Sequence, residues 1–213
     1  MDLNGKRVAI VMMSAVGDAV HVLPLVNSLK AAYPGVHLTW IIQPGPHALV
    51  KDHPAVDEFV VFDRKRGWRA FADVRRAVRG KRFDLVIALQ VYFKAGLITA
   101  MLDSPRKLGF DRVRARDANW LFTTERIPAR GQRHVQDQYF EFLEHLGVPV
   151  VLEWGLGPTE EERRRRSHSR RSSGGWAVSR FTASAAAVSR SDFPPTSTQR
   201  APSSSWRRSA SAA

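Results

Sequence analysis

Short apolar runs alternate regularly with longer segments of helical periodicity, and this alternation limits the possible folds more than any other property of the sequence. Buried strands are expected at residues 7–12, 36–42, 58–62 and 84–89, with a shorter strand at 107–110. Helices are expected between and after them, at residues 19–33, 68–78, 93–102 and 134–146. Almost continuously apolar strands that alternate with helices are typical of parallel sheets covered on both faces. The sequence therefore predicts an α/β domain of about 150 residues.

Two of these helices are amphipathic in a way that predicts their inner faces. In the helix at 68–78, one stripe is formed by Trp68, Phe71, Val74 and Val78. In the helix at 134–146, the residues expected to face inward are Val135, Tyr139, Phe142 and Leu146. The helix at 93–102 is largely apolar, so we expect it to be buried.

The composition changes abruptly after residue 162. Residues 163–213 hold 11 arginines, no lysine and one acidic residue, Asp192, and they contain 14 serines but no leucine or isoleucine. This tail accounts for +10 of the formal charge of +13, which leaves residues 1–162 nearly balanced at +3. A segment with so little apolar surface cannot offset its chain entropy, so we expect residues 158–213 to form a disordered Arg/Ser/Ala-rich tail and residues 1–157 to form the domain.

Two explanations of the tail compete. A natural basic tail would bind nucleic acid or anionic lipid, whereas translation in a wrong reading frame would leave a truncated protein. The second is preferred, because natural basic tails usually mix lysine with arginine. Thr159 and Glu162 also form a helix-start pattern that no helix follows.

The cysteine content and the hydropathy of the chain indicate the compartment. There is no cysteine, so neither a disulfide framework nor a cysteine zinc site is expected. We see no signal-peptide pattern in the opening residues and no apolar stretch near the ~20 residues that span a bilayer. A cytoplasmic protein is expected, with at most a peripheral position on the membrane.

The segment 14–21 follows the first strand directly and is the first candidate site. Ligands in open α/β folds bind at the carboxyl edge of the sheet, where this loop lies. Gly17 permits close approach of a ligand to the backbone, and Asp18 is placed to act as a general base on a hydroxyl. His21 lies three residues further on the same helical face and is a candidate to orient substrate. Spacing alone leaves two alternatives open: Asp18 can simply cap the helix, and His21 can be a hydrogen-bonded histidine without a role in binding.

Other polar groups are expected at the same edge. A basic group after the third strand comprises Arg64, Lys65, Arg66 and Arg69, whose guanidinium groups suit phosphate or carboxylate ligands. Gln90 and Lys94 follow the fourth strand, and Arg112, Arg114 and Arg116 follow the fifth, where they are candidates to contact an anionic acceptor or a lipid head group. A solvated charge run, an ordinary turn and a plain basic loop are the alternatives. No metal site and no cofactor are expected, since the seven histidines do not cluster with acids at ligand spacing.

The ordered blocks resemble the amino-terminal domain of glycosyltransferase family 9, the ADP-heptose:lipopolysaccharide heptosyltransferases. They are RVAIVMMSAVGDAVHVLPLVNSLKAAYPGVHLTWII, HPAVDEFVVFDR, FDLVIALQVYFKAGLITAML, KLGF and the helix that begins near His134. The resemblance covers about residues 6–150. It implies the amino-terminal Rossmann-like half of a GT-B enzyme, which holds a Kdo-bearing lipid A or inner-core acceptor.

The resemblance also implies an inverting, metal-independent transfer of heptose from ADP-heptose. The family's catalytic aspartate matches Asp18, the polar residue that ends its fourth strand matches Gln90, and its basic positions after strand three match Arg64 to Arg69 loosely. The family's donor motif, similar to Asp-Thr-Gly-x-x-His, does not occur in this sequence. A nucleotide-sugar donor is therefore expected only where the second domain is present, and the chain alone is expected to be inactive.

Two other functions are compatible with the sequence. One is a small α/β interaction protein whose basic tail binds nucleic acid or anionic membrane, with a steep dependence on salt. The other is a GT-B enzyme that acts on a different nucleotide-sugar. Specific nucleic-acid binding is not expected under the preferred interpretation.

Overall fold

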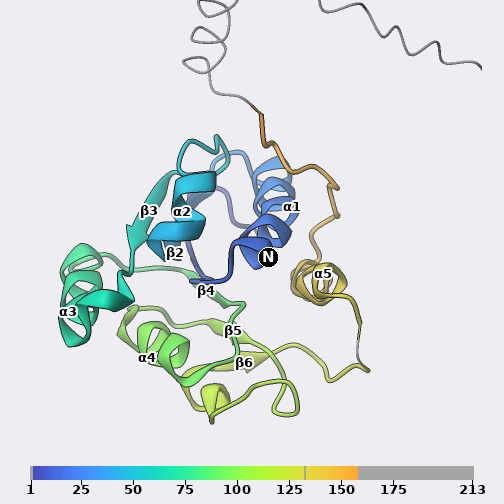
Figure 1. The fold of residues 1–213 in the computed structure, drawn as a ribbon. Helices are drawn as coiled ribbons and strands as arrows, with labels where there is room; N and C mark the ends of the chain where they lie inside the picture. The colour runs from blue at the N-terminus through green and yellow to red at the C-terminus, as the bar shows by residue number, and fades with distance from the viewer. Residues whose placement is uncertain (1, 132, 158–213) are drawn as a thin grey trace, which may run out of the picture. The chain divides into compact units, whose positions relative to one another are not determined.

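A single parallel sheet forms the centre of the domain. The computed structural model describes residues 2–131 and 133–157, and in these it contains a six-stranded sheet of order β3-β2-β1-β4-β5-β6 (Figure 1). The strands are β1 (Arg7–Val11), β2 (His37–Ile42), β3 (Glu58–Val61), β4 (Leu85–Ala88), β5 (Lys107–Gly109) and β6 (Glu125–Arg126). All neighbouring strands pair in parallel. This is the strand order of a Rossmann-like fold, so the predicted fold class is confirmed.

The strand order places β1 in the interior of the sheet, next to β4. Residues of β1 pair with β4 from Val8 opposite Leu85 to Val11 opposite Ala88. The chain leaves β1 toward β2 on one side and leaves β4 toward β5 on the other. The loops that follow Val11 and Ala88 therefore start side by side at the carboxyl edge, which is the point where such sheets bind ligands.

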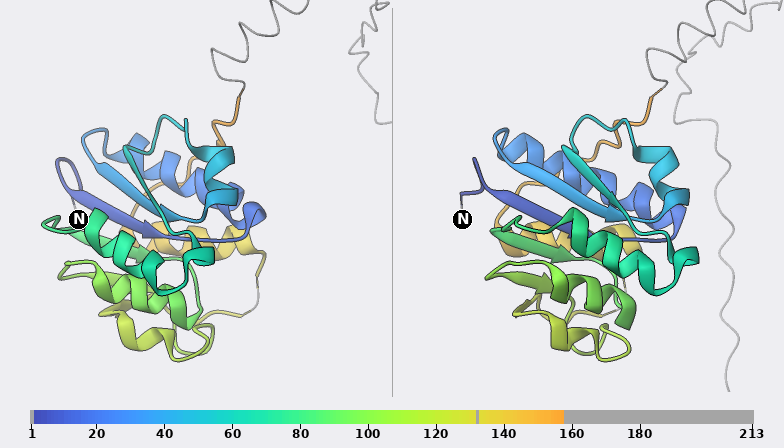
Figure 2. Two further views of the ribbon diagram at one scale, coloured as in Figure 1. Left: turned by 60° about the vertical axis from the view of Figure 1, so that its left-hand side comes forward. Right: turned by 90° about the vertical axis from the view of Figure 1, so that its left-hand side faces the viewer.

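Helices cover both faces of the sheet (Figure 2). One face is covered by α1 (Val16–Ala32), α2 (Pro44–Val50) and α5 (Val135–Leu146), and the other by α3 (Trp68–Ala77) and α4 (Phe93–Met101). Fully buried aliphatic residues of β1, β2 and β4 fill the space beneath both layers. Trp40 is the largest of the buried side chains, and its indole N–H donates to the carbonyl of Met12 at 2.9 Å. That bond anchors the start of the loop after β1.

Every strand and helix that the sequence predicted is present, with boundaries that differ by a few residues. The largest difference is in α1, which begins at Val16 rather than at residue 19, so that Asp18 lies within its first turn. The prediction omitted α2, β6 and two short 3-10 helices, η1 (Arg64–Arg66) and η2 (Asn119–Phe122). Proline at the start of α2 suits a first helical turn, because the missing N–H would have no partner there.

Two residues of the predicted inner faces are exposed instead. Trp68 is 82% exposed, since it stands at the first position of α3, beyond the end of the sheet, whereas Val74 of the same stripe is fully buried. Val135 has a similar place at the start of α5 and is 36% exposed, while Phe142 is fully buried. An apolar stripe cannot be buried where the sheet beneath it has ended.

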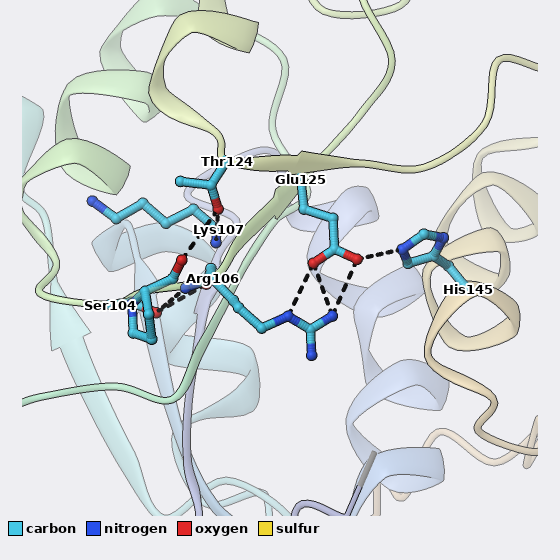
Figure 3. A network of polar contacts seen from close by, with 7 residues as sticks. Ser104, Arg106, Lys107, Thr124, Glu125 and His145 are labelled. Carbon is cyan, nitrogen blue, oxygen red and sulfur yellow. Dashed lines mark hydrogen bonds and ion pairs between the residues drawn. The ribbon is translucent and has the colours of Figure 1, made fainter.

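The last helix is fixed to the amino edge of the sheet by a charged network (Figure 3). The carboxylate of Glu125, at the start of β6, lies between the basic side chains of Arg106 and His145. Arg106 donates to it from Nε at 3.0 Å and from Nη2 at 2.8 Å, and Nε2 of His145 lies 2.7 Å from its other oxygen. Because His145 belongs to the last turn of α5, this network holds the carboxyl end of that helix against the edge strand.

Residues beyond α5 return along α1. The backbone N–H of Val151 donates to Ser28 Oγ at 2.8 Å, and Asn27 donates to the carbonyl of Glu153 at 2.6 Å. The expected tail at 158–213 and its helix-start pattern at Thr159 lie outside the described residues. Among the helices of residues 2–131 and 133–157, none has the length and apolar character needed to cross a bilayer.

Candidate active site

The junction of β1 and β4 brings together the two loops that carry the first and third candidate motifs. The N–H of Leu89 donates to the carbonyl of Val11 at 3.1 Å, so pairing continues one step beyond β4. The next residues turn out of the sheet together and are joined by side-chain bonds. Gly17, Asp18, His21 and Gln90 are thereby placed at one end of the sheet.

Gln90 connects the two loops. Its side chain is almost fully buried, its Oε1 accepts from the N–H of Met13 at 3.0 Å, and its Nε2 donates to the carbonyl of Ser14 at 2.9 Å. The Ser14–Ala15 peptide bond that follows is cis. Gln90 thus holds the loop that carries Asp18. A direct contact of Gln90 with substrate remains a prediction.

Asp18 is the third residue of α1 and is half-buried. One carboxylate oxygen, Oδ2, accepts from the N–H of Ala15 at 2.9 Å, which is a bond of the helix-capping kind. The other oxygen has no hydrogen-bond partner among residues 2–131 and 133–157. Capping therefore occupies one oxygen only, and the second is available to accept a proton. At the adjacent Gly17, an added methyl group would meet no atom within 4 Å, so the backbone is open to a ligand there.

His21 is joined to the start of α5, far away in the sequence. Its Nδ1 lies 2.9 Å from Gln136 Oε1, and its ring meets the ring of His134 edge to face at 5.3 Å. Tyr139, one turn further along α5, lies close enough to Asp18 to be affected by its charge. Burial raises the pKa of Tyr139, and the negative charge of Asp18 raises that pKa further.

The basic group after β3 is exposed and stands apart from Asp18. Arg64, Arg66 and Arg69 lie on η1 and the first turn of α3, at the carboxyl end of the edge strand. Two strand spacings, about 10 Å, separate β3 from β1. Arg66 also pairs with Asp73 at 2.5 Å. These residues share the ligand edge with Asp18 but do not belong to its immediate surroundings, and their contact with substrate remains a prediction.

The remaining basic candidates differ in whether their side chains are free to contact a ligand. Lys94 is exposed on the first turn of α4. Arg114 points inward, where it pairs with Asp111 at 2.5 Å and with Glu141 at 2.7 Å. In contrast, Arg116 is exposed, and its N–H donates to the carbonyl of Val91 at 3.0 Å, which brings it beside the loop of Gln90.

Sequence reasoning missed the contribution of α5 to this site. Gln136 and Tyr139 approach the first two turns of α1 from 115 or more residues away, and neither stands in a recognisable motif. The pattern predicted an inward Tyr139 but gave no sign that it would lie near Asp18. Within the described part of the chain, no three His, Asp or Glu side chains are grouped to hold a metal ion.

The fold and this edge define a Rossmann-like domain with an aspartate at the junction where sheets of this kind bind ligands. The chain belongs to glycosyltransferase family 9 (heptosyltransferase), whose family model matches residues 71–194. It is 30% identical over 158 residues to the lipopolysaccharide core heptosyltransferase OpsX of Haemophilus influenzae, covering 74% of this chain and 45% of that protein. It is 28% identical over 152 residues to lipopolysaccharide heptosyltransferase 1 of Salmonella typhimurium, covering 66% and 48% respectively.

Solved structures show the same relationship. The family 9 glycosyl transferase of Veillonella parvula superposes with a TM-score of 0.67 at 26% identity, covering 83% of this chain and 52% of that one. The E. coli heptosyltransferase WaaC with ADP superposes with a TM-score of 0.62 at 28% identity, covering 70% and 51%. The chain spans about half the length of the curated relatives it matches.

Proposed function

We propose that this chain forms the acceptor-binding part of a lipopolysaccharide heptosyltransferase, with Asp18 as the general base. The observation that carries the proposal is the free carboxylate oxygen of Asp18 at the carboxyl end of the central strand β1. The relatives named as lipopolysaccharide heptosyltransferases, and the WaaC structures with ADP and with ADP-2-deoxy-2-fluoro heptose, support the donor and acceptor classes. The proposed acceptor is a Kdo-bearing lipid A or inner-core saccharide, and the donor is ADP-heptose.

In the proposed step, Asp18 Oδ1 removes the proton of an acceptor hydroxyl. The hydroxyl oxygen attacks the anomeric carbon of the heptose and forms the new glycosidic bond. The bond from that carbon to the diphosphate breaks on the opposite face, and its electron pair leaves with ADP, so the configuration inverts. General base catalysis of this kind contributes roughly 10²–10⁴-fold to a rate. The groups that hold ADP-heptose are proposed to belong to a donor half, so that acceptor binding is the activity expected of the present chain alone.

The test combines acceptor binding with transfer. A deacylated Kdo-bearing oligosaccharide is titrated into the full chain by calorimetry at moderate salt, and transfer from ADP-heptose is followed by mass spectrometry. We expect saturable binding that Asp18→Asn preserves, because the amide keeps the shape of the carboxylate. In a chain joined to a donor half, the same substitution should lower transfer about 100-fold or more. An Asp18→Asn variant with full transfer, or a wild-type chain that does not bind the oligosaccharide, would refute the proposal.

The exposed cations at the carboxyl edge provide a second expectation for the same titration. Arg64, Arg66 and Arg69 should strengthen binding to the acidic acceptor, so alanine at these positions should weaken it several-fold. Arg75 is also exposed on α3 but lies two turns further from the edge, and Arg75→Ala serves as the matched control. The arginine-rich tail is common to all variants, so the difference between them does not include its contribution.

The proposal includes peripheral contact with the inner face of the plasma membrane. Large apolar side chains are exposed at the carboxyl edge beside the cations, with Val113 87% and Trp68 82% exposed. Such a mixture suits the interface of an anionic bilayer. The chain has no cysteine, so a single fluorophore can be placed at Val113→Cys or, at the opposite edge, at Asn4→Cys. Vesicles rich in phosphatidylglycerol should shift the emission of the first label to shorter wavelength and leave the second unchanged.

A further inference from the structure

The hydrogen bonds of Gln136 determine which nitrogen of His21 carries a proton. The side-chain amide Nε2 of Gln136 donates to the backbone carbonyl of His21 at 2.8 Å. A carbonyl only accepts, so this bond fixes the orientation of the amide and leaves Oε1 facing the imidazole. Oε1 lies 2.9 Å from His21 Nδ1. Because an amide oxygen is also only an acceptor, His21 Nδ1 must be the donor.

The neighbouring histidine has the opposite arrangement. The backbone N–H of Gln136 donates to Nδ1 of His134, which precedes α5, at 3.3 Å. A neutral His134 therefore carries its proton on Nε2. The two imidazoles meet edge to face, with ring planes at 86°. Gln136 thus contacts both rings, one through its side chain and the other through its backbone.

We propose that Gln136 is a positioning residue that holds His21 as the Nδ1–H tautomer, so that the Nε2 lone pair accepts a hydrogen bond from a sugar hydroxyl beside Asp18. Residues three apart on a helix are neighbours on its surface, so His21 and Asp18 stand side by side on α1. In the part of the chain that the structure describes, His21 Nε2 has no hydrogen-bond partner. The ring of His134 contacts the ring of His21, and Asp18 lies one turn earlier on α1, close enough to Tyr139 to affect its pKa.

This role depends on the proposed function, since it assigns His21 a contact with the same saccharide. The chemistry is that of a polyol: Asp18 takes the proton of one hydroxyl, and the neutral imidazole accepts a hydrogen bond from another. A tautomer with a proton on Nε2 would have no lone pair there, so it could donate to the oxygen of that hydroxyl but could not accept its proton.

The tautomer itself can be measured by NMR. Long-range proton–nitrogen spectra of the ¹⁵N-labelled full chain distinguish protonated from unprotonated ring nitrogens, and His21→Gln identifies the signals of His21 among the seven histidines. At mildly alkaline pH we expect His21 to show a protonated Nδ1 and an unprotonated Nε2. Gln136→Leu should convert most of His21 to the Nε2–H form, which free imidazole side chains prefer. Gln138→Leu is the matched control: this half-buried glutamine of the same helix donates to the carbonyl of Arg133 and not to His21, so its loss should leave the His21 tautomer unchanged.

Three outcomes would overturn the inference. They are an Nε2–H form of His21 in the wild type, a Gln136→Leu spectrum that matches Gln138→Leu, and unchanged acceptor affinity in Gln136→Leu despite a converted tautomer. The wild-type spectrum decides the first point even where Gln136→Leu fails to fold. The tautomer does not depend on any ligand. A chain with the expected tautomer that binds no acceptor would therefore refute the proposed function and not the assignment of the proton.

Discussion

Arg114→Met tests whether Arg114 stabilises the domain from within. The guanidinium lies between two carboxylates, with Asp111 Oδ2 at 2.5 Å and Glu141 Oε2 at 2.7 Å. The side chains are 14% exposed for Arg114, 9% for Asp111 and 3% for Glu141, so none of the three is well solvated. Within the described residues, Glu141 Oε1 is also buried without a hydrogen-bond partner. Methionine would keep an apolar side chain of similar length but remove the guanidinium, which pairs with Glu141 and whose Cζ lies 5.0 Å from the centre of the Phe110 ring.

The expected loss is large because it leaves buried charge unpaired. Removing one partner of a buried ion pair costs about 3–5 kcal/mol. For a chain of this size that corresponds to a fall in melting temperature of roughly 6–20 °C. The control is Arg76→Met, whose guanidinium is 78% exposed and pairs with Asp73 at 3.2 Å. An exposed pair contributes about 0–1 kcal/mol, so this control should be nearly neutral.

Urea unfolding followed by circular dichroism measures both variants. Glu141→Gln in the Arg114→Met background should recover part of the loss, because a neutral amide is cheaper to leave buried than a carboxylate. The result that would refute the reasoning is an Arg114→Met variant within about 1 kcal/mol of Arg76→Met. If Arg114→Met leaves the stability unchanged and weakens acceptor binding, then Arg114 contacts the substrate, as the sequence suggested.

The pH dependence gives an independent check on the same network. Burial alone would raise the pKa of Asp111, but hydrogen bonds from Arg114 and from the N–H groups of Val113 and Arg114 outweigh it, and the pKa of Asp111 is lowered from 3.8. A carboxyl with a lowered folded pKa stabilises the fold above its ordinary pKa, and this contribution is lost as the pH falls through the lowered value. The wild type should therefore lose this contribution only below pH 3.8, and Arg114→Met should show a smaller loss there.

Four further substitutions have defined expectations. Gln90→Leu should cost about 1–3 kcal/mol in urea unfolding, because it leaves the buried N–H of Met13 without its acceptor. Gly96→Ala should cost a similar 1–3 kcal/mol, roughly, since its Cβ would overlap the ring of Phe122, whereas Gly17→Ala meets no atom and should fold as stably as the wild type. Glu125→Gln should cost about 1 kcal/mol at neutral pH. For Glu125, burial raises the pKa, but bonds from His145 and Arg106 lower it below 4.5, so the difference from Glu125→Gln should vanish in acid.

The sequence predicted the parts of the fold whose cause is local. Buried strands such as Arg7–Val11 and Leu85–Ala88 consist almost entirely of apolar, mostly β-branched residues, and their pattern is visible without any partner. The carboxyl-edge position of Asp18 followed from the same reasoning, because a residue after a parallel strand lies at that edge whatever the order of strands. The two-residue strand β6 has no such pattern, since its pairing depends on β5 rather than on its own composition.

Local sequence patterns could not predict the order of the strands in the sheet. That order brings the residues of the candidate site together. Gln90 lies next to the loop of Asp18 only because β4 pairs with β1, and an order that separated these strands would have left both motifs intact and unconnected. The same argument applies to His21. Its pattern on α1 allowed a substrate contact or an ordinary hydrogen-bonded histidine, and the amide that decides its protonation comes from α5, 115 residues away. The motif around Asp18 indicates which chemical groups are present. Which ring nitrogen of His21 carries the proton depends on Gln136, and the spacing of residues within the motif cannot specify that distant side chain.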